Sequence, residues 1–151
     1  MFQRILVGID GSTVSRHALQ TAVQLAKALN SRVRIVHVID LGPLYEAAAS
    51  GVDVSDVERT MVQDGRNLLA QAQDVARQGS VTSETALLPI YGTRIIDTIV
   101  DDAKQWTADL IVLGTHGRHG LGRLILGSVA EGVARSSPIP VLLVRGPAHG
   151  P

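Results

Sequence analysis

Short apolar runs alternate along the chain with longer stretches in which apolar residues recur every three or four positions. Runs of the first kind predict buried strands, and stretches of the second kind predict amphipathic helices. The predicted strands cover residues 5–9, 32–39, 82–88, 109–113 and 141–144. One predicted helix follows Ser12, and three others cover residues 55–78, 94–105 and 128–135. This alternation indicates an α/β fold with a parallel sheet and right-handed crossovers.

Several boundaries follow from local signals. Ser55 to Glu58 and Ser128 to Glu131 have the spacing of a capping box and predict two helix starts. Gly79 is expected to stop the first of these helices. Gly65, inside the same helix, is a weak point at which a break would be unsurprising. Pro89 is expected to close the third strand.

Two segments are predicted to be irregular. Residues 40–54 are rich in Gly, Ala and Ser and predict a loop, and the polar, Pro- and Gly-rich residues 147–151 predict a flexible tail. The sequence gives no sign of an internal repeat or a second domain, so residues 1–146 are expected to form a single domain.

Composition narrows the possible functions. Fourteen basic residues balance fourteen acidic ones and only 3% of residues are aromatic, so neither nucleic acid nor an anionic membrane surface is an expected partner. The absence of cysteine excludes disulfides and thiolate chemistry and is typical of a reducing cytosol. No apolar run approaches the roughly 18 residues of a membrane span. We therefore expect a cytoplasmic protein.

The candidate chemistry lies after strands. In open α/β sheets, ligands bind beyond the carboxyl ends of the strands, where the strand order changes direction. Residues 10–12 follow the first strand, and residues 114–127, which contain five glycines, follow the fourth. Glycine permits positive φ and lets backbone amides approach phosphate oxygens, and the helix that begins near Ser128 adds free N–H groups and a favourable dipole. Arg118 and Arg123 add positive charge. A plain turn is the simpler alternative, but five glycines exceed what a turn requires.

Other motifs fit less well. The segment lacks the Gly-Lys-Ser/Thr of a Walker loop, and a dinucleotide fingerprint would open the first helix. His116 and His119 have a metal-like spacing but no third ligand nearby, so a position beside phosphate is the better interpretation. The His-Gly-Arg-His order only partly matches the His-x-Gly-His of nucleotidyltransferases. His37, inside a strand, is expected at the core or its rim, and His17 at the surface.

Nearly the whole chain resembles the universal stress protein family. The nucleotide-binding signature is matched by Gly114, two residues, Gly117, nine residues, and then Gly127 and Ser128. The further matching features are Asp10 after the opening strand, His37–Val38 near the end of the second, and the closing Ser-Pro-Ile-Pro-Val-Leu-Leu-Val.

This resemblance implies a Rossmann-like three-layer α/β/α fold with a five-stranded parallel sheet ordered 3-2-1-4-5, and bound ATP in members that keep the signature. It assigns the ribose to Asp10, the adenine edge to the backbone of Val38, and the ribose and phosphate path to Gly114 and Gly117. Residues 127–129 would hold the phosphates. The full predicted cofactor-binding set is Ile9, Asp10, Val38, Gly114, Thr115, Gly117, Arg118, Gly127, Ser128 and Val129.

The leading functional hypothesis is an ATP-binding protein of stress response or signalling, whose output depends on nucleotide occupancy and dimerisation. AMP and ADP are alternative ligands, and Mg²⁺ is expected to be held mainly by the phosphates. A homodimer is predicted through the apolar strand Val141–Val144, with a further signalling partner that the sequence does not identify. The alternatives are a slow ATPase, autokinase or nucleotidyltransferase, and a nucleotide-free dimeric interaction module. No base positioned by a third group is evident, so efficient catalysis is not expected.

Overall fold

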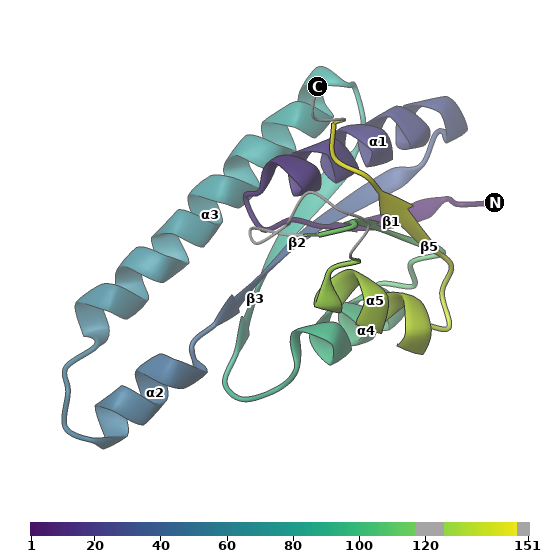
Figure 1. Cartoon of the computed structure of the whole chain (residues 1–151). Coiled ribbons are helices and arrows are strands. Elements are labelled where there is room, and N and C mark those ends of the chain that lie inside the picture. The colour runs from purple at the N-terminus through teal and green to yellow at the C-terminus, as the bar shows by residue number, and fades with distance from the viewer. Residues whose placement is uncertain (117–125, 148–151) are drawn as a thin grey trace.

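Five parallel strands form one sheet at the centre of the fold (Figure 1). The computed structural model describes residues 1–116 and 126–147. The strands are β1 (Arg4–Gly8), β2 (Arg32–Asp40), β3 (Ser83–Ile90), β4 (Leu110–Gly114) and β5 (Val141–Val144). Their order, β3-β2-β1-β4-β5, confirms the expected topology, and all neighbouring pairs are parallel.

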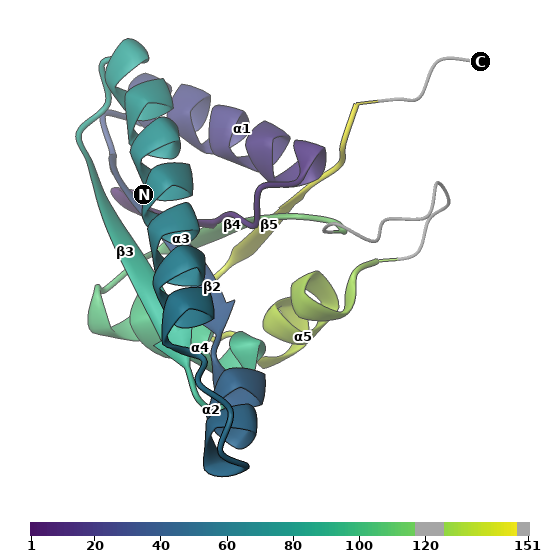
Figure 2. The ribbon, with the colours of Figure 1, turned by 90° about the vertical axis from the view of Figure 1, so that its left-hand side faces the viewer.

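Helices cover both faces of the sheet and complete the predicted three layers (Figures 1 and 2). One face carries α1 (Thr13–Leu29) and α3 (Ser55–Gln78). The opposite face carries α4 (Ile95–Gln105) and α5 (Ser128–Ser136). A further helix, α2 (Gly42–Ala49), lies beyond the end of β2, outside the two layers, and has no buried residue.

The core consists of two apolar clusters separated by the sheet. Successive strand residues point to opposite faces, so Val7 packs beneath α1 and α3 whereas Leu6 packs against α4 and α5. Both side chains have no exposed surface. Burial on both faces explains why β1 and β4 are continuous apolar runs rather than alternating ones.

A polar network joins β2, β3 and α4 away from the strands' carboxyl ends. The Arg34 guanidinium forms a two-bond ion pair with Asp102, with Nε–Oδ2 2.8 Å and Nη2–Oδ1 2.9 Å, and a third bond of 2.9 Å to Glu84. The hydrogen bond to Asp102 raises the pKa of Arg34. Trp106 donates its indole N–H to Glu84 at 2.7 Å, and the Arg4 guanidinium lies 4.1 Å from the centre of the Trp106 ring. The charge of Arg34, which is largely buried, is thus paired with two carboxylates.

The predicted loop over residues 40–54 is wrong in part, because it contains α2. Pro43 lies in the first turn of that helix, where its fixed φ and missing N–H cost nothing, and three alanines follow Glu46. The Asp40 carboxylate accepts the Gly42 N–H at 2.9 Å and supports the entry to the helix. The helix was missed because it buries no apolar stripe, the signal on which helix prediction rests.

Both predicted capping boxes are wrong by one residue. Ser55 and Ser128 are the first helical residues, and the N-cap positions belong to Val54 and Gly127, neither of which makes a side-chain cap bond. At α3 the capping role falls to Asp53, whose carboxylate accepts the Ser55 N–H at 3.0 Å and its hydroxyl at 2.7 Å. The Ser-x-x-Glu spacing is present at both helices, but each serine is the first helical residue, whereas a capping box requires it at the N-cap.

One further local prediction is wrong, and one weak point carries no break. The helix α3 runs through Gly65 without interruption. A Cβ there would lie 2.7 Å from Leu87 Cδ1, so the glycine lets the helix approach the sheet. Strand β3 continues through Pro89 to Ile90. Because Leu41 donates its N–H to the Ile90 carbonyl, the even-numbered residues of β3 face β2 and Pro89 directs its nitrogen to the open edge.

The domain boundary at residue 146 stays a prediction, since residues 148–151 of the predicted tail lie outside the described part of the chain. None of the helices in residues 1–116 and 126–147 combines the length and the apolar character needed to cross a membrane.

Candidate functional site

The carboxyl ends of β1, β2 and β4 lie side by side at one edge of the sheet. From β1 the chain moves outward to β2 and β3, then returns to the other side of β1 to form β4 and β5. The order therefore reverses between β1 and β4, which is where open α/β sheets bind ligands.

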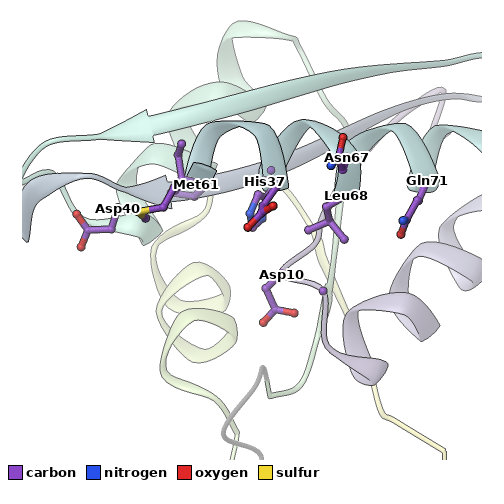
Figure 3. Close-up of a pocket in the computed structure, with 12 residues that line it drawn as sticks. Asp10, His37, Asp40, Met61, Asn67, Leu68 and Gln71 are labelled. Carbon is purple, nitrogen blue, oxygen red and sulfur yellow. The ribbon is translucent and has the colours of Figure 1, made fainter. Parts of the chain in front are cut away.

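A pocket of about 620 Å³ opens at this edge, between the ends of β1 and β2 and the overlying helix α3 (Figure 3). Its volume lies within the range of about 300–1,000 Å³ typical of small-molecule sites. Asp10 and Val38, two residues of the predicted set, line it. The strand side is completed by Gly11, His37, Ile39 and Asp40.

The turn after β1 fixes the position of Asp10. Its carboxylate accepts the Ser12 N–H at 2.9 Å, and Gly11 between them has φ +83°, a conformation that favours glycine. Ser12, rather than Asp10, caps α1, because the Ser12 hydroxyl accepts the Ser15 N–H at 3.1 Å. The Asp10 carboxylate points away from α3 (Figure 3). The turn thus orients this carboxylate without making it the helix cap.

The backbone of Val38 lies beyond the end of β1. The pairing of β1 with β2 ends at Gly8 and Val36, and Ile9 donates its N–H to the Val36 carbonyl at 2.9 Å. Because N–H and C=O directions alternate along a strand, both backbone groups of Val38 point to the same side as those of Val36. Val38 therefore directs a donor and an acceptor past the end of β1.

The wall formed by α3 was not predicted. Met61, Asp64, Gly65, Leu68 and Gln71 recur at intervals of three or four residues and so share one face of the helix. Gly65 allows this face to approach β2 and β3 closely, with no Cβ to meet Leu87. The spacing was visible in the sequence, but nothing in it indicates that this part of α3 lies over the end of β2.

Apart from Ile9, the remaining described residues of the predicted set lie where β4 ends and α5 begins, outside the lining of this pocket. Thr115 donates its N–H to the Val144 carbonyl at 2.9 Å, and its own carbonyl accepts the Gly127 N–H. These bonds tie the start of α5, with Ser128 and Val129, to the end of β4. Ile9 directly follows β1, and its carbonyl accepts a bond from the His37 ring. Gly117 and Arg118 lie outside the described residues.

Close approach explains the two described glycines of the signature. A Cβ on Gly114 would lie 2.6 Å from Val14 Cγ1 of α1, and one on Gly127 would lie 3.0 Å from both Thr115 O and His116 Cα. Gly127 has φ −60°, so a requirement for positive φ there is wrong. Bulky replacement of Gly127 would disturb the fold as well as any ligand.

Among residues 1–116 and 126–147, no three His, Asp or Glu side chains are grouped so that they could hold a metal ion.

The model of the universal stress protein family matches residues 1–145, so the chain belongs to that family. The universal stress protein YxiE of Bacillus subtilis is 33% identical over 152 residues, covering 96% of this chain and 100% of its own.

Two solved structures are similar throughout. A protein of the universal stress protein family from Burkholderia pseudomallei is 29% identical, with a TM-score of 0.74, and the match covers 94% of this chain and 95% of that one. A universal stress protein in complex with cAMP is 28% identical, with a TM-score of 0.67 and coverage of 95% and 97%.

Proposed function

We propose that the protein binds an adenine nucleotide, ATP foremost, at the carboxyl ends of β1, β2 and β4, and that nucleotide occupancy sets its output in stress response or signalling. The observation that carries this proposal is the pocket of about 620 Å³ at the reversal of strand order, bordered by Asp10 and the backbone of Val38. The similarity to a family member in complex with cAMP supports it. A cytoplasmic location, expected from the cysteine-free composition, is part of the proposal.

The base and the sugar would be bound from the β1–β2 side. Adenine presents an amino donor beside ring-nitrogen acceptors. The C=O of Val38 offers the acceptor for the amino group, and its N–H offers the donor for a ring nitrogen. The Asp10 carboxylate is suited to accept hydrogen bonds from ribose hydroxyls. Because this carboxylate points away from α3 (Figure 3), the sugar would lie between the base pocket and the end of β4.

The phosphates would be bound from the β4–α5 side. The first N–H groups of α5, at Ser128 and Val129, have no acceptor within the helix, and the helix dipole favours an anion there. The Ser128 hydroxyl adds a donor. Gly114 and Thr115 would continue the phosphate path, together with Gly117 and Arg118, which lie outside the described residues. Mg²⁺ would be held mainly by phosphate oxygens and water.

Identification of a bound nucleotide tests the proposal. Acid extraction of the purified protein should release an adenine nucleotide, and calorimetry with ATP, ADP, AMP and cAMP should rank the ligands. With Mg²⁺, phosphate release should stay well below about 1 per second, the lower end of the kinase range. Turnover at that rate would favour the enzymatic alternatives. If none of the four nucleotides binds, the result would instead favour the nucleotide-free interaction module.

A second element of the proposal is homodimerisation through β5. This strand is an edge of the sheet, and Leu142 in it remains 37% exposed. An apolar edge of this kind favours pairing with a second copy. Dimerisation is compatible with either nucleotide occupancy or a nucleotide-free module.

A further inference from the structure

The imidazole of His37 is bonded to the end of β1. Its Nδ1 lies 2.7 Å from the Ile9 carbonyl oxygen, and because a carbonyl can only accept, Nδ1 carries the proton. The ring lies on the α3 side of the sheet, where its Cδ2 would be 3.4 Å from a Cβ on Gly65. Glycine at position 65 therefore leaves room for the ring between α3 and the end of β1.

This bond replaces the next step of the β1–β2 ladder. The last bond between the strands runs from the Ile9 N–H to the Val36 carbonyl, at 2.9 Å. In a regular parallel ladder the following bond would run from the Val38 N–H to the Ile9 carbonyl. The described hydrogen bonds include no such bond, and the Ile9 carbonyl is bonded to the His37 ring instead.

We infer that His37 is a positioning residue for the nucleotide base: by holding the Ile9 carbonyl on the α3 side, it leaves the Val38 N–H available to a ligand. Ladder bonds lie close to the sheet plane, whereas the imidazole draws this carbonyl toward α3. The assignment rests on the proposed adenine nucleotide site. It explains a polar ring in the wall of the pocket without requiring the ring to touch the ligand.

Three substitutions separate this role from a direct contact. His37→Asn keeps an N–H donor near the position of Nδ1 and removes Nε2. His37→Gln places its amide nearer the position of Nε2, and His37→Leu removes both nitrogens. If His37 acts through Ile9, His37→Asn should bind ATP nearly as well as the wild type. His37→Leu and His37→Gln should each lose roughly 5- to 10-fold in affinity, the effect of one neutral hydrogen bond.

Hydrogen exchange of the Val38 amide, measured by NMR without nucleotide, tests the same inference independently of binding. In His37→Leu the Ile9 carbonyl should return to the ladder and bond the Val38 N–H. Exchange at Val38 should then slow by about 10-fold relative to the wild type, while the other β2 amides keep their rates. His37→Asn should leave Val38 exchange unchanged.

The outcomes are distinguishable. Faster exchange throughout β2 in His37→Leu would show a merely structural role and overturn the inference. Tight ATP binding by His37→Gln with weak binding by His37→Asn would show a direct contact through Nε2 and overturn it as well. If the wild type binds none of the nucleotides, the proposed function fails, but the exchange at Val38 still decides whether His37 controls the Ile9 carbonyl.

Discussion

The carboxylate of Asp10 lies just beyond β1, where a turn residue can serve a helix, a ligand or both. In this chain the helix is capped by Ser12, and Asp10 accepts the Ser12 N–H from within the turn. The capping role therefore falls on Ser12, and the proposed ligand role on Asp10. That separation allows the ligand role of Asp10 to be tested without removing the helix cap.

The variant Asp10→Ala should weaken ATP binding by about 10- to 100-fold, because a charge-assisted hydrogen bond contributes roughly 1.5–3 kcal/mol. Calorimetry gives the affinity, and denaturant unfolding gives the free energy of unfolding. The matched control is Ser12→Ala, which removes the cap of α1 and should lower stability by about 1 kcal/mol with little change in affinity. Equal affinities for Asp10→Ala and the wild type would argue against a sugar contact.

At the scale of the element, the site depends on how closely α3 approaches the sheet. Gly65 is buried although it lies in the middle of a long helix, where glycine costs about 1 kcal/mol relative to alanine. The nearest obstacle to a Cβ is Leu87 Cδ1, the end of a flexible side chain, followed by the His37 ring. A small side chain could therefore be accommodated by a shift of Leu87, whereas a large one could not.

Substitution of Gly65 by leucine should destabilise the fold by about 1–3 kcal/mol, because overpacking pushes α3 away from β2. It should also weaken nucleotide binding, since Gly65 and His37 share the same pocket. Gly65→Ala should stay near the wild type in stability, with the gain in helix propensity offsetting the shift of Leu87. Ala70→Leu, at an exposed position of the same helix, serves as the control and should change neither stability nor affinity appreciably. A Gly65→Leu protein of wild-type stability and affinity would contradict this account.

Elements were predictable from the sequence to different degrees for physical reasons. Strands such as β1 and β4 were found because burial on both faces leaves continuous apolar runs, whereas β2 was found from its alternation. Asp10 was found because it follows a strand end, and Val38 was indicated by the resemblance to the family. The helix α2 was missed because it buries nothing, and the capping boxes were misplaced because their spacing does not fix where the chain enters the helix. His37 and the α3 wall required knowledge of which helix lies over which strand end, and that arises from long-range packing.

For the whole molecule, the two edges of the sheet differ in how they resist pairing. At β3, Pro89 directs its nitrogen outward, and a residue without an N–H there interrupts any strand that would pair with this edge. At β5 the Thr115 N–H bonds the Val144 carbonyl, so by alternation Val141 and Leu143 direct their backbone groups outward. All four residues of β5 are apolar, and Leu142 is 37% exposed. The geometry favours β5 over β3 as the edge that would pair with a second copy.

The variant Leu142→Lys should therefore convert a homodimer into a monomer. The wild type is expected to pair β5 with β5 of a second copy about a two-fold axis, because isologous contact is the commonest closed arrangement. A lysine in each copy would bring two like charges together across the axis and oppose that pairing. Leu142 is the better position than Leu143, which packs against the core on the α4–α5 face and would destabilise the protomer if replaced.

Light scattering on the peaks eluted from a size-exclusion column, loaded at high micromolar concentration, measures the mass of the wild type and of each variant directly. Val57→Lys provides the control, because Val57 at the start of α3 is 50% exposed and the same loss of an apolar surface residue there should leave the dimer intact. Far-ultraviolet dichroism of Leu142→Lys should match the wild type, since β5 would keep its bonds to β4 in the monomer. A wild type that is monomeric at these concentrations would exclude dimerisation through β5. A Leu142→Lys protein that remains dimeric would move the interface to another surface.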